Sequence, residues 1–291
     1  MHLPERRCEA DTSLFRASEP VTGRLWAFRI PNSEFRIGRW GGHSPLSRGP
    51  GGPMISDMQR FLAAVSVVVV VLLAAPAWSA EVVRMRVDDT IQPASRQFIE
   101  RVLEEAAARD AGLVVMELDT PGGLLDTTRD ITSAIIGSPV PVVVYVAPSG
   151  ARAASAGFFI LIAADVAVMA PGTNTGAAHP VGGQGENLPE DVRDKATNDA
   201  AAMIRSLAEQ RGRNSETAER AVRESISLTA DEALAEKLID FIAKDLDDLL
   251  AQLDGYELRR GDGETRTLEL EDAVVVELEA SFAERLLSVL A

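Results

Sequence analysis

The residue best placed for nucleophilic chemistry is Ser155, in the small-residue segment 148–159, which reads PSGARAASAGFF. A β-branched run, Val140–Val146, precedes this segment and an apolar run, Phe158–Ala164, continues it, a pattern that predicts a strand, a turn and a buried helix. Ser155 then lies at the helix start, where unpaired backbone N–H groups favour negative charge on a nearby oxygen. Taken alone, a serine in such a turn is more often an ordinary helix-start residue, so partners elsewhere must support the interpretation.

A second turn could supply hydrogen-bond donors to the same reaction. Gly122 and Gly123 follow the apolar run Leu113–Leu118, and the carboxyl ends of parallel strands meet at one edge of a sheet. We therefore predict an oxyanion hole made of the N–H groups of Gly122, Gly123 and Ala156, facing the carbonyl that Ser155 would attack. The alternative is that Pro-Gly-Gly forms an ordinary turn. Without the serine turn, the two interpretations would be about equally probable.

A serine nucleophile needs a neighbouring base, and the chain offers few. Its lysines are Lys195, Lys237 and Lys244, among many arginines. A guanidinium cannot lose its proton in a protein but an ammonium can, so a scarce lysine is a candidate base if burial lowers its pKa from about 10.4 to roughly 7–8. Lys237 and Lys244 are interpreted as solvated charges. His179, in a glycine-rich loop, competes with Lys195 for the role, and a simple turn residue is the alternative interpretation of that histidine.

Strand-like and helix-like patterns alternate after the first 79 residues, which predicts an α/β domain over residues 80–253 with mostly parallel strands. The predicted strands are Glu81–Val87, Leu113–Leu118, Val140–Val146, Val166–Met169 and Ile239–Ala243. The predicted helices are Gln92–Asp110, Leu124–Ile136, Phe158–Ala164, Asp191–Gln210, a helix to Leu238 opened by a capping box at Thr229–Glu232, and Leu246–Leu253. Residues 173–190 are expected to form a long loop, of a length that is usually either functional or disordered. Residues 254–291 are expected to form a tail with a hairpin, a further strand at Ala273–Leu278 and a short helix.

The first 79 residues have a different character. Residues 58–79 combine a short basic start, an apolar core and small residues at A-x-A-like spacing, which predicts a signal peptide or signal anchor. Because such a signal works at an N-terminus, we interpret residues 1–57 as non-globular, mis-assigned upstream sequence, with the true start at Met54 or Met58. An internal signal anchor is the alternative. The domain that follows is expected to be exported, to the periplasm or the outer face of the inner membrane.

Composition excludes several classes of function. The formal net charge of −15 argues against nucleic-acid binding, which requires clustered Lys and Arg. The chain has one cysteine, Cys8, and beyond the signal its one histidine is His179, so no disulfide framework and no metal site are expected. The turn at 119–123 lacks a phosphate-loop pattern, and we expect no cofactor.

Three phrases carry a family resemblance: LDTPGGL at 118–124, AASAG at 153–157 and MAPGTNTGAAHP at 169–180. Together they resemble the ClpP-class serine proteases of crotonase-like fold, and more closely the NfeD-type membrane-associated proteases, over about residues 82–253. The resemblance implies an ATP-independent serine endopeptidase with a Ser–Lys dyad, here Ser155 and Lys195. It also implies apolar segments of membrane proteins as substrates, a stomatin-like protein as partner, and assembly at least as a dimer.

The same resemblance sets His179 where ClpP carries the histidine of a Ser-His-Asp triad. The position of the triad aspartate, however, falls at Ser225, which cannot orient an imidazolium as a carboxylate does. The dyad is therefore favoured, with His179 as a lining residue or alternative base. Family members continue into transmembrane helices and a small β-barrel domain, so a chain ending at Ala291 is interpreted as a short form or a truncated product. Two rival functions are a crotonase-fold acyl-thioester enzyme and a non-catalytic scaffold that binds membrane-protein segments.

Overall fold

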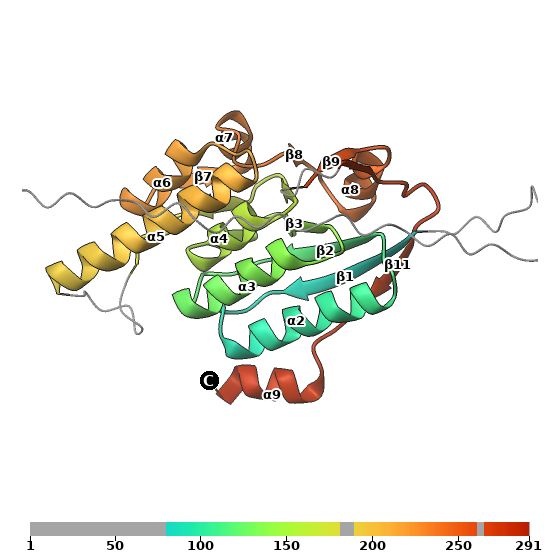
Figure 1. Ribbon diagram of the computed structural model, residues 1–291, viewed down its shortest axis with the longest axis horizontal. Coiled ribbons are helices and arrows are strands. Elements are labelled where there is room, and N and C mark those ends of the chain that lie inside the picture. Colours follow the sequence, from blue (N-terminus) through green and yellow to red (C-terminus); the bar gives the residue numbers. More distant parts are fainter. Residues whose placement is uncertain (1–79, 181–188, 261–264, 291) are drawn as a thin grey trace, which may run out of the picture. The chain divides into compact units, whose positions relative to one another are not determined.

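The computed structural model describes residues 80–180, 189–260 and 265–290, all within one compact unit. The predictions for residues 1–57 and for the signal segment 58–79 lie outside the described residues. The fold that follows is therefore that of the predicted α/β domain and its tail (Figure 1).

A six-stranded sheet, parallel throughout, forms the centre of the domain, in the order β11-β1-β2-β3-β5-β8. Its strands are β1 (Glu81–Val87), β2 (Leu113–Leu118), β3 (Val142–Val146), β5 (Val166–Met169), β8 (Phe241–Ile242) and β11 (Val274–Glu277). Every residue of β2, β3 and β5 is buried, as expected for strands covered on both faces. The parallel α/β class predicted from the alternating pattern is confirmed.

Helices cover one face of this sheet in two layers. They are α2 (Pro93–Ala108), α3 (Leu125–Gly137), α4 (Ala156–Ala163), α5 (Glu190–Gln210), α6 (Ser215–Arg223) and α7 (Ala230–Ala235). The larger apolar core lies between the sheet and α2, α3 and α4, with α5 and α6 packed outside α4. A smaller core on the opposite face is closed by α8 (Leu246–Leu253) and the antiparallel hairpin β9 (Glu257–Arg259) and β10 (Thr265–Thr267).

Three short strands that the sequence patterns did not predict form a second sheet beside the first. They are β4 (Arg152–Ala154), β6 (Asn174–Gly176) and β7 (Ser227–Thr229), in the order β4-β6-β7. Helix α6 was also missed, whereas the capping box that opens α7 is confirmed, since Thr229 and Glu232 exchange side-chain and backbone hydrogen bonds. Part of the predicted loop after residue 173 is thus a strand, and residues 181–188 of it lie outside the described residues.

The C-terminal tail contains the predicted hairpin, strand and helix, and its strand joins the main sheet. β11 pairs in parallel with β1 at the edge of the sheet. The last helix, α9 (Phe282–Leu290), runs along α2 and is held there by the carboxylate of Glu284, which accepts hydrogen bonds from Arg101 Nε at 2.9 Å and Arg101 Nη2 at 3.0 Å. The backbone N–H of Ser281 donates to the same carboxylate.

These bonds make the docking of α9 dependent on pH. The hydrogen bond from Arg101 is the main cause that lowers the pKa of Glu284 from its usual 4.5 to about 2. Because docking lowers this pKa, the ionised carboxylate of Glu284 stabilises the docked helix above about pH 4.5. This contribution is lost as the pH falls toward 2 and the carboxylate is protonated. We therefore expect the amides of residues 282–287 to lose protection against exchange with solvent deuterium over that range, measured relative to the intrinsic exchange rate at the same pH, and in Glu284→Gln already at neutral pH. Glu277→Gln, which alters only a weak 3.5 Å contact with Arg84, is the control; equal exchange in both variants would contradict this account.

Candidate active site

Ser155 lies at the start of α4 in a strained backbone conformation. Its φ of 50° and ψ of −112° are unusual for a residue with a side chain, and such conformations persist only where the surroundings enforce them. The enforcement is visible on both sides, because β4 ends at the residue before Ser155 and all eight residues of α4 are buried. The Ser155 N–H donates to the carbonyl oxygen of Gly176 at 2.9 Å, so the missed strand β6 directly positions this serine.

Two arginines bind the other end of α4. Arg213 Nη1 donates to the carbonyl oxygens of Ile162 and Ala164, and Arg211 Nε donates to that of Ala163. A helix leaves its last carbonyls without partners, and positive charge there also complements the helix dipole. Because these guanidinium groups are themselves buried, the helix that carries Ser155 is fixed at both ends.

The Pro-Gly-Gly turn lies against Ser155, as the sequence predicts. A β-carbon added to Gly122, whose φ is +126°, would lie 2.7 Å from the β-carbon of Ser155. A β-carbon added to Gly123 would lie 2.0 Å from the carbonyl oxygen of Ile91, because this segment pairs with Ile91 through the Ile91 N–H to Gly122 carbonyl bond and the Leu124 N–H to Ile91 carbonyl bond. Only glycine allows both close approaches.

The three predicted oxyanion donors differ in availability. The Gly122 N–H already donates to Thr120 Oγ1 at 3.2 Å. Within the described ranges, the N–H groups of Gly123 and Ala156 donate to no protein acceptor, although both residues line the cavity next to Ser155. Gly123 is exposed and Ala156 is buried, and backbone donors without a protein acceptor beside the hydroxyl are what a developing oxyanion needs. Thr120, which sequence reasoning did not single out, is buried and braces the turn.

Ser155 opens onto a cavity of about 720 Å³ with a mostly apolar wall. Its apolar lining residues are Ile91, Pro121, Leu124, Leu125, Ala156, Phe159, Ala177, Ala178, Pro180 and Ala200. Such a wall suits an apolar side chain or an extended apolar segment next to the hydroxyl. Within the described ranges, no group of three or more His, Cys, Asp or Glu residues is placed to hold a metal ion.

His179 lines the same cavity as Ser155. Its Nδ1 is 3.3 Å from the carbonyl oxygen of Val222, which assigns the hydrogen to Nδ1 and leaves Nε2 able to accept a proton. Among the residues that the structure describes, no carboxylate contacts this imidazole, and Ser225, at the position of a triad aspartate, is exposed. A complete Ser-His-Asp triad is therefore not assembled in the described part of the chain.

Lys195 lies outside the lining of the cavity. It is exposed on the second turn of α5. Five residues of ideal helix separate it from the lining residue Ala200, so the two side chains point about 140° apart around the helix axis and are offset by about 7.5 Å along it. The first turns of α5 project beyond α3 and α4 (Figure 1), and Pro189 provides no side-chain cap. The structure thus brings Ser155, Gly122, Gly123, Ala156 and His179 together but not Lys195.

Known proteins match this domain along most of its length. The model of the family "NfeD1b, N-terminal domain" matches residues 81–278, and the chain belongs to this family. A membrane-bound protease of Pyrococcus horikoshii is 35% identical over 234 residues, which are 79% of this chain and 53% of that protein. The chain therefore spans about half the length of this curated relative.

Solved structures of a membrane-bound stomatin-specific protease have the same fold. A lysine-to-alanine mutant in complex with a substrate peptide superposes with a TM-score of 0.68 at 33% identity, covering 73% of this chain and 98% of that one. A serine-to-alanine mutant superposes with a TM-score of 0.65 at 33% identity, covering 70% and 99%. The predicted family and fold are confirmed.

Proposed function

We propose that this protein is a serine endopeptidase in which Ser155 is the nucleophile. The observation that carries the proposal is the arrangement at the start of α4: a strained, cavity-facing serine beside the two unpaired N–H groups of Gly123 and Ala156. A serine next to paired oxyanion donors is what acyl transfer requires. The names of the solved relatives, which are proteases, support the same class of reaction.

The reaction would proceed through an acyl-enzyme. Ser155 Oγ attacks the carbonyl carbon of the peptide bond as a base takes its proton, and the carbonyl oxygen becomes an oxyanion bound by the N–H groups of Gly123 and Ala156. The base then protonates the leaving amine as the C–N bond breaks, which leaves an ester on Ser155. Water, deprotonated by the same base, cleaves the ester and restores the hydroxyl.

We propose Lys195 as that base. Its position after the glycine-rich loop and the lysine-to-alanine mutant among the solved relatives support this role. The role requires the first turns of α5 to turn toward the cavity when a substrate binds. Residues 189–192 are all exposed and Thr197 is the first buried residue of α5, so little packing opposes such a movement. His179 is the alternative base, and its place in the cavity lining favours it in the conformation described.

Apolar segments of membrane-associated proteins are the proposed substrates. The apolar wall of the 720 Å³ cavity supports this choice, and the relatives are named as membrane-bound and stomatin-specific proteases. By the same likeness we propose a stomatin-like protein as the physiological partner, assembly at least as a dimer, and export to the outer face of the membrane through the predicted signal.

A fluorophosphonate probe tests the proposed activity. Phosphonylation requires an activated serine, so the probe is expected to modify the wild-type protein at Ser155, as located by peptide mass spectrometry, and to leave Ser155→Ala unlabelled. Ser133→Ala, at an exposed serine of α3 that bonds only within its helix, is the matched control and should label normally. A folded wild-type protein that resists the probe would instead indicate the scaffold or the acyl-thioester enzyme.

A further inference from the structure

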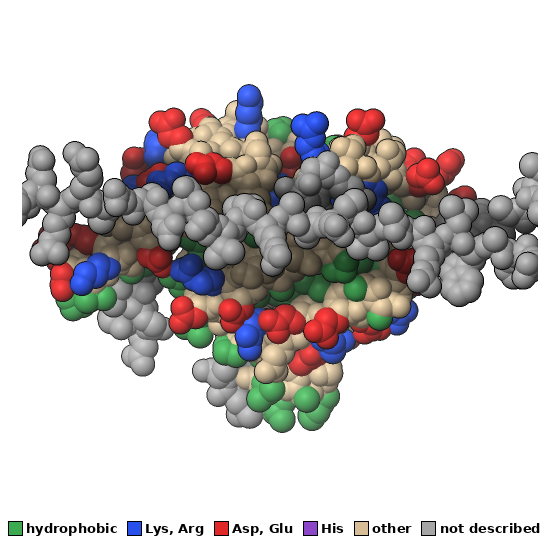
Figure 2. Space-filling view, viewed as in Figure 1, with side chains coloured by type: hydrophobic (Ala, Val, Ile, Leu, Met, Phe, Trp, Pro, Cys, Tyr) green, Lys and Arg blue, Asp and Glu red, His purple; other side chains and the backbone are tan. Residues whose placement is uncertain are grey.

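Thr120 is a buried polar residue to which the proposed reaction assigns no step. Charged side chains of both signs are spread over the surface that Figure 2 shows, where water can solvate them. Thr120 is 0% exposed, so its hydroxyl needs partners within the protein. Both partners lie in the Pro-Gly-Gly turn: Thr120 Oγ1 accepts a hydrogen bond from the Gly122 N–H at 3.2 Å and donates one to the Gly122 carbonyl oxygen at 3.3 Å.

These bonds hold the peptide group between Gly122 and Gly123 in one orientation. Its carbonyl oxygen, on Gly122, accepts the Thr120 hydroxyl and also the Ile91 N–H at 2.8 Å. Glycine on both sides offers little steric resistance to rotation of this group, so its hydrogen bonds decide the direction. In a trans peptide the N–H points opposite to the C=O. The Gly123 N–H is therefore turned away from Thr120 and Ile91, and Gly123 lines the same cavity as Ser155.

The rest of Thr120 connects this turn to the segments that carry the serine. The Thr120 N–H donates to the carbonyl oxygen of Arg152 at 2.7 Å, and the Ala154 N–H donates to the Thr120 carbonyl oxygen at 3.1 Å. Both partners belong to β4, which ends one residue before Ser155. On the side of α4, a β-carbon added to Gly157 would lie 2.6 Å from the Thr120 methyl carbon, so the first turn of the helix packs closely against that methyl group.

We propose that Thr120 is a positioning residue that fixes the oxyanion donors relative to Ser155. The proposal rests on the proposed function of the site. The hydroxyl sets the direction of the Gly123 N–H, while the backbone and the methyl group set the place of the turn against β4 and α4. Thr120 is not among the residues that line the cavity, so it acts through its neighbours. One buried side chain thereby joins the donor on the turn, Gly123, to the donor on the helix, Ala156.

Two substitutions separate the hydroxyl from the methyl group. Thr120→Val keeps the shape of the side chain and removes the hydroxyl, whereas Thr120→Ser keeps the hydroxyl and removes the methyl group. With a fluorogenic apolar peptide, Thr120→Val is expected to lower kcat by about tenfold or more and to leave KM nearly unchanged, because a misdirected oxyanion donor is missed mainly in the transition state. Thr120→Ser should retain most of the wild-type kcat, and an equal loss in both variants would overturn the role of the hydroxyl.

Hydrogen exchange gives a readout that does not depend on catalysis. The acceptor of the Ile91 amide is the Gly122 carbonyl oxygen, so Thr120→Val should reduce the protection of that amide, measured by NMR in the full chain, and Thr120→Ser should not. Reduced protection in Thr120→Val, together with a wild-type protein that cleaves no peptide, would contradict the protease proposal and support the positioning of the turn. A folded Thr120→Val protein with wild-type protection of Ile91, or with the kcat of an active wild-type protein, would overturn the positioning role.

A second pair of variants tests the contact between Thr120 and α4. Gly157→Ala should lower kcat, because the new β-carbon would lie 2.6 Å from the Thr120 methyl carbon. Adding Thr120→Ser removes that methyl group and leaves the new β-carbon with neighbours at 3.4 and 3.8 Å, which are ordinary contacts. The double variant should therefore regain most of the activity that Gly157→Ala loses. A double variant no more active than Gly157→Ala would count against this contact.

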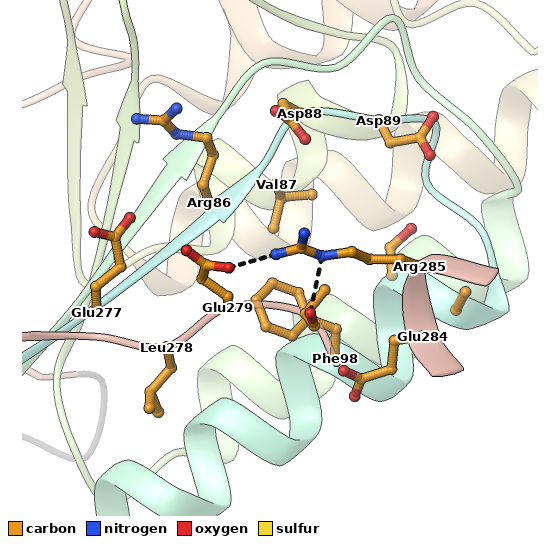
Figure 3. Close-up of a pocket in the computed structure, with 13 residues that line it drawn as sticks. Arg86, Val87, Asp88, Asp89, Phe98, Glu277, Leu278, Glu279, Glu284 and Arg285 are labelled. Atoms are coloured by element: carbon orange, nitrogen blue, oxygen red, sulfur yellow. Dashed lines mark hydrogen bonds and ion pairs between the residues drawn. The ribbon is translucent and has the colours of Figure 1, made fainter. Parts of the chain in front are cut away.

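Two controls remove polar interactions outside the site. Thr132→Val removes a buried hydroxyl that donates to the Arg129 carbonyl oxygen within α3. Glu279→Gln removes an ion pair with Arg285 in a cavity of about 420 Å³ that does not include Ser155 (Figure 3). Both variants should keep the wild-type kcat and the wild-type protection of the Ile91 amide. A loss of kcat in Thr132→Val as large as that in Thr120→Val would contradict a specific role for Thr120.

Discussion

Replacing Lys195 with alanine is expected to lower the rate of peptide cleavage by about 10²–10⁴-fold, the contribution that general acid–base catalysis usually makes. If Lys195 is the base, the variant loses the group that accepts the hydroxyl proton and returns it to the leaving amine. Lys195→Arg should not rescue the rate, because a guanidinium keeps its proton. Steady-state cleavage of a fluorogenic apolar peptide measures the effect, and Lys244→Ala, at an exposed lysine before α8, is the matched control.

His179→Ala separates the two candidate bases. If Lys195 is the base, removing the imidazole takes away only part of the cavity wall and a hydrogen bond to Val222, and the rate should fall by less than about tenfold. The pH dependence of the cleavage rate gives a second way to distinguish the two bases, because the base must be unprotonated to act. Retained activity in Lys195→Ala together with a large loss in His179→Ala would assign the base to His179.

Gly123→Ala should lower kcat by about 10²–10³-fold, the usual effect of losing one oxyanion donor. The new β-carbon would meet the carbonyl oxygen of Ile91 at 2.0 Å, so the turn must move and carry the Gly123 N–H away from the oxyanion. A donor that acts mainly in the transition state affects kcat and kcat/KM alike and leaves KM nearly unchanged.

A matched glycine distinguishes this effect from general damage to the fold. Gly137, at the end of α3, has no atom within 4 Å of an added β-carbon, so Gly137→Ala should retain full activity. Circular dichroism of Gly123→Ala should show native secondary structure. Unchanged kcat in a folded Gly123→Ala protein would remove Gly123 from the proposed oxyanion hole.

The central sheet was predictable because β2, β3 and β5 are short, largely apolar runs bounded by turn residues, while β1 alternates enough to indicate a strand. The predicted bounds of β1, β2 and β5 agree with the structure to the residue, as do those of α8. The two turns at the site were predictable for a related reason, since both follow such strands and the ends of parallel strands meet at one edge.

The second sheet was not predictable, because its strands are three residues long and lack the alternation that marks a strand. β4 reads Arg-Ala-Ala and β6 reads Asn-Thr-Gly, and their pairing joins segments separated by about twenty residues. For β11 the strand was foreseen but its partner was not: β1 lies far earlier in the chain, and periodicity carries no information about which strands pair.

The orientation of Lys195 could not be predicted from the sequence for a different reason. The helix was predicted correctly, but its first residues, Glu190–Asp194, have no apolar stripe to indicate which side faces the domain. The structure places that turn in solvent, so spacing along the chain alone could not locate the amine relative to the hydroxyl.

The backbone angles of Ser155 also bear on how this domain can evolve. A residue with a side chain held at such angles costs on the order of 1–3 kcal/mol, a sizeable part of the roughly 5–15 kcal/mol by which folded domains are stable. Glycine would adopt the same angles without that cost. Selection for heat resistance alone would therefore favour glycine at position 155, whereas selection for turnover must keep the hydroxyl there.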